Sequence, residues 1–372
     1  MRIMITGGGT GGHTSPALAV IEELRRRDPQ LLLQWIGKRG GMEEEVARRN
    51  MIPFRALPVE GWSRRKSPRM LWILVKLAYS MVRAWMYLKV FQPQAVFGVG
   101  GYVSLPALWV AQRINIVTVL HEQNKRLGLA NRLCAARTTR LLLSYPETEG
   151  NYPEERAILT GNPVRHAFLH PPDKDSAREQ LGLKPGIPAI LVVGGSQGAH
   201  TLNEATAYLL QEFKPDELQV IWSAGKAEFA QARMRAEEAP NKSKVHAFIE
   251  DMATTCAAVD IVVSRAGASM TAELAALGKP SILVPYPYAA DNHQEHNARA
   301  FQSAGAAEVL LDNECTGERL AERVRGLIND PDRMNIMGES AKSLARPLAA
   351  EEIAETIIQL VYQGAAGHSV NG

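Results

Sequence analysis

The sequence predicts an α/β protein with two similar domains, each a parallel β-sheet flanked by helices. A chain of 372 residues is longer than one compact core usually accommodates, so two domains are expected. An apolar strand, a glycine-rich turn and a helix open the chain, and the same pattern returns near residue 190. Strand and helix patterns alternate after each opening, which is typical of βαβ units in a parallel sheet.

The composition excludes several classes of protein. Hydrophobic residues make up 46% and charged residues 22%, the values of a soluble globular protein. The glycines and prolines follow no period, so a collagen-like chain is excluded. The three cysteines lie far apart, which predicts neither a disulfide framework nor a cysteine metal site. No signal-peptide pattern opens the chain, and a cytoplasmic protein is expected.

The first domain is predicted from a series of short apolar strands. A strand at residues 3–6 leads through glycines at 7–12 into a helix at 15–27, and a second strand follows at 31–36. Further strands are predicted at 95–98, 116–120 and 140–143. A polar, proline-containing stretch at 145–156 and the turn at 161–163 indicate the end of the domain.

The second domain is predicted to repeat this plan. A strand at 190–193, a glycine turn at 194–198 and a helix at 199–213 open it. Strands at 219–222, 245–248, 261–264 and 281–284 alternate with helical stretches. The last helix, at 349–362, is amphipathic, and its pattern alone assigns it to neither domain.

The glycine loop at residues 7–12 resembles two phosphate-binding signatures. Its spacing fits the dinucleotide pattern, but Gly37, Lys38 and Arg39 follow the second strand where that pattern needs an acidic residue. His13 stands where a P-loop needs lysine, which excludes a P-loop ATPase. Glycine N–H groups at a helix N-terminus still favour an anion. The alternative is a tight turn without a ligand.

Polar residues gather where the first-domain strands end. His13 follows the glycine loop and is either a general base or an ordinary capping or surface histidine. Residues 98–102 and 121–124 end two further strands. Ligands of open α/β sheets bind at the carboxyl ends of the strands. These three strand ends therefore predict an active-site edge.

Two further anion cradles are predicted in the second half. One is the glycine turn at 194–198, and the other is the small-residue turn at 264–269, which leads into a helix carrying Glu273. Glu273 is either a ligand of ribose hydroxyls or an ordinary exposed glutamate. His293 and His296 are spaced HxxH without an evident third ligand, so no metal site is predicted. Contacts with sugar hydroxyls are favoured there.

The segment from Trp62 to Phe91 is both basic and apolar. No acidic residue occurs between Gly61 and His121, whereas eight lysines and arginines do. Three cations within the apolar stretch argue against a membrane-spanning helix, and the pattern indicates a helix lying in an anionic membrane interface. A buried domain helix with snorkelling cations is the alternative. Nucleic-acid binding is not predicted, because no recognised motif accompanies the charge.

Six motifs in order identify a known family. They are Gly8–His13, Gly100–Ser104, His121–Asn124, Gly161–Arg165, Gly194–Ala199 and Ser264–Glu273. Together they resemble the MurG family of peptidoglycan N-acetylglucosaminyltransferases over residues 6–297. Six ordered motifs are far more specific than one glycine loop.

The resemblance implies a GT-B fold, in which two Rossmann-like domains face each other across a cleft. Residues 1–163 with 346–372 would form the acceptor and membrane-binding domain, and residues 164–345 the UDP-GlcNAc domain. The implied reaction moves GlcNAc from UDP-GlcNAc to the C4 hydroxyl of MurNAc in lipid I. It gives lipid II with inversion and needs neither metal nor cofactor.

The resemblance also implies roles for individual residues. His13 would be the catalytic base, with Glu122 as its rival. The implied donor ligands from the UDP-GlcNAc side are Arg165, Ser196, Ile249, Ala268, Ser269, Met270, Thr271, Glu273 and Gln294. The residues implied to close over the donor from the acceptor domain are Thr10, Gly11, Gly12 and Asn124. The acceptor diphosphate would contact Gly9, Gly100, Gly101 and Tyr102.

The implied location is the cytoplasmic face of the cell membrane, with the segment from Trp62 to Phe91 on the anionic inner leaflet. Other cell-wall synthesis proteins are candidate partners, and nucleic acid is not. A UDP-GlcNAc 2-epimerase of the same fold needs neither an acceptor nor a membrane. A non-catalytic nucleotide-sugar-binding regulator has no use for His13. An NAD dehydrogenase is disfavoured by the missing ribose-binding acid.

Overall fold

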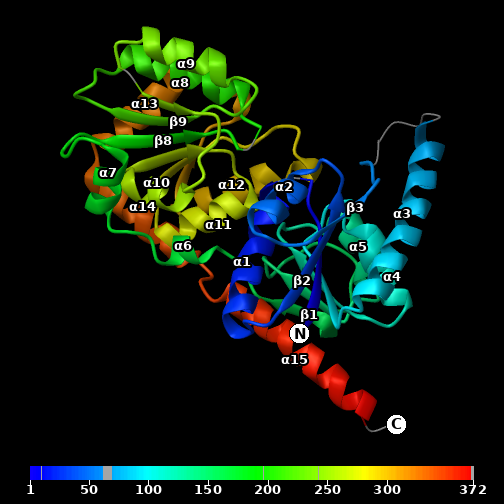
Figure 1. Ribbon diagram of the computed structural model, residues 1–372. Helices are drawn as coiled ribbons and strands as arrows, with labels where there is room; N and C mark the ends of the chain where they lie inside the picture. The colour runs from blue at the N-terminus through cyan, green and yellow to red at the C-terminus, as the bar shows by residue number, and fades with distance from the viewer. Residues whose placement is uncertain (10, 62–68, 196, 242, 370–372) are drawn as a thin grey trace. The chain divides into compact units, whose positions relative to one another are not determined.

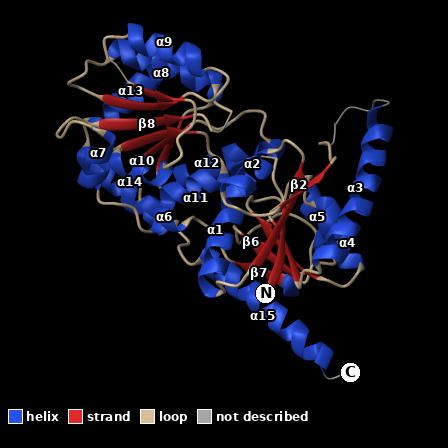
Figure 2. Cartoon of the chain, viewed as in Figure 1, coloured by secondary structure: helices blue, strands red, loops and turns tan. Residues whose placement is uncertain are grey.

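The computed structural model describes residues 1–9, 11–61, 69–195, 197–241 and 243–369. The chain forms two compact units. The first unit contains Met1–Arg165 and Arg346–Gly372, and the second contains His166–Ala345. Each is an α/β unit with one parallel sheet (Figures 1 and 2). The predicted fold class is confirmed.

The first unit has a seven-stranded sheet in the order β3-β2-β1-β4-β5-β6-β7. Its strands are β1 (Arg2–Thr6), β2 (Leu32–Lys38), β3 (Phe54–Leu57), β4 (Ala95–Gly98), β5 (Val117–Glu122), β6 (Arg140–Leu143) and β7 (Ala157–Leu159). Each neighbouring pair is parallel. The carboxyl ends of β1, β4 and β5 therefore lie together at one edge.

Helices cover the faces of the first sheet (Figure 2). They are α1 (Gly11–Arg27), α2 (Met42–Arg49), α3 (Arg69–Phe91), α4 (Leu105–Arg113), α5 (Leu129–Ala135), the 3₁₀ turn η1 (Glu154–Arg156) and α15 (Ala349–Ser369). The last helix packs beside α1 (Figure 1). Ile353 and Ile357 of α15 are fully buried in the same core as Ile21. The apolar stripe of α15 thus belongs to the first unit.

The second unit has a six-stranded parallel sheet in the order β10-β9-β8-β11-β12-β13. Its strands are β8 (Ala189–Val193), β9 (Gln219–Ser223), β10 (Lys244–His246), β11 (Ile261–Ser264), β12 (Ser281–Leu283) and β13 (Ala307–Val309). Its helices are α6 (His166–Leu169), α7 (Lys174–Leu181), α8 (His200–Glu212), α9 (Phe229–Glu238), α10 (Met252–Ala258), α11 (Ala268–Leu277), α12 (His293–Ser303), α13 (Gly317–Ile328) and α14 (Pro331–Ser343). The 3₁₀ turns are η2 (Ala290–Asn292) and η3 (Asp312–Glu314).

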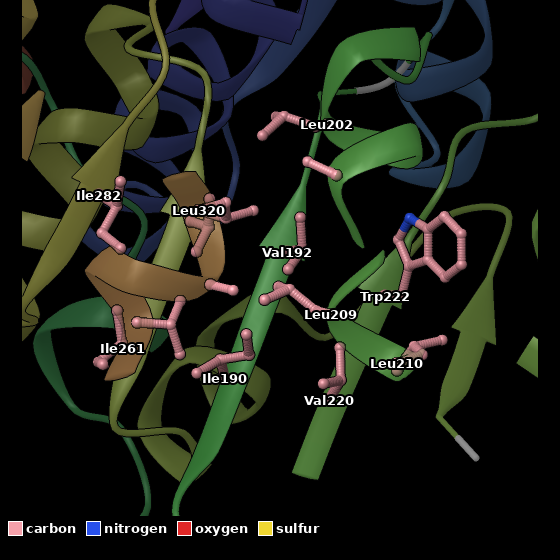
Figure 3. Packing of buried hydrophobic residues seen from close by; sticks show 14 of the residues in the cluster. Ile190, Val192, Leu202, Leu209, Leu210, Val220, Trp222, Ile261, Ile282 and Leu320 are labelled. Atoms are coloured by element: carbon pink, nitrogen blue, oxygen red, sulfur yellow. The ribbon is translucent and has the colours of Figure 1, made fainter. Parts of the chain in front are cut away.

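The core of the second unit forms between β8 and the helices on one face of its sheet. Figure 3 shows Val192 of β8 near Leu209 of α8, with Trp222 of β9 beside them. The indole nitrogen of Trp222 donates a hydrogen bond of 2.9 Å to Asn203 Oδ1. A buried indole N–H needs such a partner. This contact fixes α8, and with it the glycine turn that precedes the helix.

The strand predictions succeed in the middle of each sheet and fail at the edges. The strands at 95–98, 140–143 and 261–264 have the predicted bounds. Three short edge strands, β3, β7 and β13, were not predicted. The strand predicted at 245–248 is instead β10 (Lys244–His246), and Phe248 beyond it is exposed. Edge strands are half-solvated and lack the continuous apolar run of a buried parallel strand.

Candidate active site

The glycine loop joins β1 to α1 at the carboxyl edge of the first sheet. Gly7, Gly8 and Gly9 have φ angles of 135°, 151° and 89°, which side-chain-bearing residues rarely adopt. A Cβ atom on Gly8 would lie 2.4 Å from the carboxylate of Glu43. The glycines are therefore required by the close packing of the loop.

Glu43 is a site residue that the sequence reasoning missed. It is fully buried in the first turn of α2. Its Oε2 accepts a 3.0 Å hydrogen bond from Gly9 N, and its Oε1 accepts one of 2.7 Å from Lys38 N. The acid missing directly after β2 thus comes a few residues later and binds the glycine loop itself. The run of three glutamates that opens α2 was the available signal.

His13 lies in the first turn of α1 and is half-buried. Its Nδ1 is 2.9 Å from Val99 O and 3.1 Å from Gln123 Oε1. Burial lowers the pKa of His13 below its usual value of 6.5, against the opposing effects of these two hydrogen bonds and the charge of Glu43. The imidazole is therefore neutral near pH 7 and able to accept a proton.

The turn after β4 encloses the His13 ring. Gly100 and Gly101 have φ angles of 84° and 78°. Cβ atoms on these glycines would lie 3.4 Å from the His13 ring, and one on Gly101 would also lie 2.5 Å from Gly8 O. Tyr102 lies beside Gly9, 3.7 Å from the position of a Cβ there. The structure thus brings together His13 and the four residues predicted for the acceptor diphosphate.

Glu122 ends β5 and is buried. Its Oε1 accepts hydrogen bonds of 3.1 Å from the backbone N and the Nδ2 of Asn124. Its Oε2 accepts hydrogen bonds of 2.9 Å from Gly128 N and 2.8 Å from Asn131 Nδ2. Burial raises the pKa of Glu122 and these hydrogen bonds oppose the rise. With four donors aimed at it, the carboxylate holds the loop that carries Asn124.

In the second unit, β11 ends at Ser264 and α11 begins at Ala268. The turn between them is anchored by Arg265, whose Nη1 pairs with Asp312 Oδ1 at 2.6 Å and donates to Val284 O at 3.2 Å. The N-cap residue of α11 is Gly267, and no described residue lies within 4 Å of a Cβ placed there. This helix N-terminus has the geometry of an anion cradle.

The predicted donor ligands on α11 differ in exposure. Ala268, Ser269 and Thr271 are buried, and Met270 is half-buried. Glu273 is buried as well. The alternative that Glu273 is an ordinary exposed glutamate is therefore wrong.

The start of α12 lies against the same turn. Asn297 Nδ2 donates a 3.1 Å hydrogen bond to Ala266 O, and Gln294 Oε1 accepts one of 2.9 Å from Tyr286 N. His293 Nδ1 is 2.7 Å from Ala290 O. Across the described residues, no three or more His, Cys, Asp or Glu side chains form a group able to hold a metal ion.

The remaining predicted donor residues are spread over both units. Ile249 is buried and lies in the loop that connects β10 to α10 in the second unit. Arg165 is half-buried at the end of the first segment of the first unit, and Gly11 and Gly12 begin α1 there. Thr10 and Ser196 lie outside the described residues, as does the start of the segment from Trp62 to Phe91.

Helix α3 packs against α4 on one side and exposes apolar side chains on the other. Ile73, Ala84 and Leu88 are buried. The exposed apolar residues of α3 are Leu71, Trp72, Leu74, Val75, Tyr79, Val82, Trp85, Met86 and Val90. Because so much of the helix is exposed, the alternative of a buried domain helix is wrong.

Two cations of α3 lie among its aromatic residues. Lys76 is 5.7 Å from the centre of the Trp72 ring and donates to Glu60 Oε2 at 2.7 Å. Arg83 lies 5.1 Å from the centre of the Tyr87 ring. By length and composition alone, Met70–Phe91 also meets the criteria for a membrane span. The sequence argument against a span rests on its cations.

Comparisons with known protein families identify the class of protein to which this chain belongs. The model of the glycosyltransferase family 28 N-terminal domain matches residues 3–143, and that of the family 28 C-terminal domain matches residues 189–353. Together these two matches account for most of the chain. The chain belongs to glycosyltransferase family 28.

Individual relatives narrow this class. The chain is 39% identical to a protein of Desulforudis audaxviator over 98% of this chain and all of that protein. It is 37% identical to one of Halalkalibacterium halodurans over 95% and 98%. Both are named UDP-N-acetylglucosamine--N-acetylmuramyl-(pentapeptide) pyrophosphoryl-undecaprenol N-acetylglucosamine transferase. The predicted resemblance to the MurG family is confirmed.

Solved structures agree with this placement. MurG of Acinetobacter baumannii matches with a TM-score of 0.73 and 27% identity, over 96% of this chain and 99% of that one. The UDP-GlcNAc 2-epimerase of Neisseria meningitidis matches with a TM-score of 0.67 and 14% identity, over 96% and 100%. The second likeness reflects a shared fold alone.

Proposed function

We propose that this chain transfers GlcNAc from UDP-GlcNAc to the C4 hydroxyl of MurNAc in lipid I, with inversion, and so forms lipid II. The observation that carries this proposal is near-full-length identity of 37–39% with relatives named for that transfer. The His13 site supports it, because a neutral, half-buried histidine at a sheet edge suits proton removal from a hydroxyl.

His13 is the base in this proposal. Glu122 is less suitable, since four donors already hold its two oxygens. The acceptor O–H bond breaks and its proton passes to His13. The freed oxygen forms a bond to the anomeric carbon, and the bond from that carbon to UDP breaks, with its electron pair on the diphosphate.

The second unit binds the donor. The turn at residues 265–267 and the N-terminus of α11 face the diphosphate and stabilise the charge that develops on it. Glu273 accepts hydrogen bonds from the ribose, Gln294 contacts the sugar, and the backbone of Ile249 contacts the uracil. Arg165, which directly precedes the second unit in the chain, supplies a positive charge for the leaving diphosphate. The first unit binds the acceptor diphosphate through its glycine turns.

Transfer of labelled GlcNAc from UDP-GlcNAc to a lipid I analogue, with EDTA present, tests the proposal. A lipid II-like product supports both the transfer and its independence from metal. Release of ManNAc and UDP instead would identify a 2-epimerase. Binding of UDP-GlcNAc with neither product would identify a regulator.

We also propose that α3 docks the enzyme on an anionic membrane surface at the cytoplasmic face of the cell membrane. Its exposed apolar face, its aromatic residues and its cations are the features of an interfacial helix. Part of the helix is packed on α4, so the exposed face rather than the whole helix contacts lipid.

Vesicle sedimentation tests the docking. Lys76→Glu with Arg83→Glu should lower binding to anionic vesicles by about 10- to 100-fold, since each cation near such a surface contributes about 1 kcal/mol. Lys184→Glu with Lys214→Glu makes the same charge change at exposed positions of the second unit and should bind as the wild type does. Equal binding by the α3 variant and the wild type would contradict the docking.

A further inference from the structure

The hydrogen bonds of His13 continue beyond the glycine loop through Gln123. This buried glutamine directly follows β5. Its Oε1 is 3.1 Å from His13 Nδ1, and its Nε2 is 2.8 Å from Val99 O and 3.1 Å from His121 Nδ1. His121 Nε2 in turn lies 3.0 Å from Gly161 O. One side chain thus joins two histidines.

The backbone carbonyls of Gly161 and Val99 determine the direction of each hydrogen bond that links His121, Gln123 and His13. Gly161 O can only accept, so His121 Nε2 carries a proton and donates it. Burial lowers the pKa of His121 to about 4, which keeps the ring neutral and leaves the lone pair on Nδ1. That lone pair and Val99 O both need a donor, and the amide nitrogen of Gln123 is the donor between them. Rotating this amide by 180° would set its oxygen against two acceptors.

With its orientation fixed in this way, Gln123 presents its oxygen to His13. Val99 O faces the same ring nitrogen at 2.9 Å. Two acceptors at Nδ1 require a proton on Nδ1, and a neutral imidazole has only one. We propose that Gln123 is a positioning residue that holds His13 as the Nδ1–H tautomer, so that Nε2 is the atom that takes the proton of the acceptor hydroxyl. This inference rests on the proposed function.

The same contacts serve after the proton has moved. When Nε2 accepts the hydroxyl proton, the ring becomes an imidazolium, and Nδ1–H still donates to Gln123 Oε1 and Val99 O. Both oxygens stabilise the positive charge. Loss of Gln123 should therefore reduce the rate of the chemical step and leave UDP-GlcNAc binding in the second unit unchanged.

Substitutions of Gln123 separate its effect on His13 from a general loss of packing. Among the described residues, Glu43 of α2 and His121 of β5 are the titratable groups that interact electrostatically with His13. Gln123→Glu places a carboxylate beside Nδ1, which favours the imidazolium and should move the acidic limb of the pH–kcat profile to higher pH. Gln123→Leu removes an acceptor and should move that limb to lower pH.

The rate measurements use the full chain with saturating UDP-GlcNAc and a lipid I analogue. Gln123→Leu should lower kcat on the order of 10²-fold, as expected for a misplaced catalytic group, with the KM for UDP-GlcNAc unchanged. Thr118→Val is the matched control, because it removes a buried hydroxyl elsewhere on β5 and should leave the pH profile unchanged. A wild-type kcat and pH profile in Gln123→Leu would overturn the proposal.

A spectroscopic measurement keeps the inference testable if a variant does not fold. In the wild-type chain, ¹⁵N NMR of the imidazoles, with His13 assigned by its loss in His13→Gln, should show a protonated Nδ1 and a lone pair on Nε2. The Nε2–H tautomer would overturn the inference even if transfer occurs. Absence of transfer alongside the Nδ1–H tautomer would instead count against the proposed function.

Discussion

The two units begin with the same strand, glycine turn and helix, but the packing around their glycines differs. In the first unit the glycines are packed from within, since Glu43 binds Gly9 N and a Cβ on Gly8 would collide with its carboxylate. The opening turn of the second unit is also packed at Gly194 and Gly198, where a Cβ would lie 2.4 Å from Ala199 N and 2.3 Å from Ala224 O. However, no described residue lies within 4 Å of a Cβ placed on Gly195 of that turn or on Gly267 of the β11–α11 turn. The first turn thus holds a side chain, His13, in place, whereas the two second-unit turns leave room for a ligand beside Gly195 and Gly267.

The largest expected effect is on the transfer rate, and it distinguishes His13, in the first turn of α1, from His200, the first residue of α8. His13→Ala should lower the transfer rate by about 10²- to 10⁴-fold, the usual contribution of a general base, with UDP-GlcNAc affinity retained. His200→Ala, at the start of α8, should keep the wild-type rate because His200 is exposed and pairs with Glu228. Initial rates and titration calorimetry measure both. Equal losses of transfer rate in the two variants would mean that the two histidines do not differ in their contribution to the reaction.

Donor affinity should depend on the second unit. Glu273→Gln should raise the Kd for UDP-GlcNAc by about 10- to 100-fold, since a hydrogen bond to a charged group contributes about 1.5–3 kcal/mol. The KM for the acceptor should not change. Glu237→Gln, on the exposed surface of α9, is the matched control. An unchanged Kd in Glu273→Gln would remove this residue from the donor site.

A pair of alanine substitutions tests the packing of the β1–α1 turn and of the β11–α11 turn directly. Gly8→Ala should destabilise the chain by about 1–3 kcal/mol, because its Cβ would overpack the loop against Glu43. Gly267→Ala, which has an ordinary φ of −68° and open space, should change stability by less than about 0.5 kcal/mol. Urea unfolding measures both. Similar losses would mean that the turns are packed alike.

The smallest expected effect is on the pH dependence of stability in the first unit. Burial lowers the pKa of His121 to about 4, so the unfolded chain binds more protons than the folded one below about pH 6.5. Stability should fall by about 1–2 kcal/mol between pH 6.5 and pH 5 because of this residue. His121→Gln should flatten that slope in urea titrations. Parallel slopes in the variant and the wild type would contradict this assignment.

The sequence allowed the class, the central strands and the order of the motifs to be predicted, because buried parallel strands and glycine turns have strong local signals. Glu43 could not be assigned, since its role depends on the packing of α2 against a loop more than thirty residues earlier. Likewise, the burial of Glu273 follows from the packing of α11. The local sequence pattern does not indicate which face of a short helix is covered by other elements.

Helix α15 has a consequence for how this protein forms. It follows the whole second unit along the chain, yet Ile353 and Ile357 complete the core of the unit that contains the first strand. When residues 1–165 have left the ribosome, all seven strands of the first sheet are present. The helix that covers part of this sheet, α15, is still missing. The second unit has all its own elements by residue 345 and can fold first. Synthesis therefore leaves the first unit incomplete until α15 emerges, and a nascent chain cut short before α15 has a complete second unit and an open core in the first.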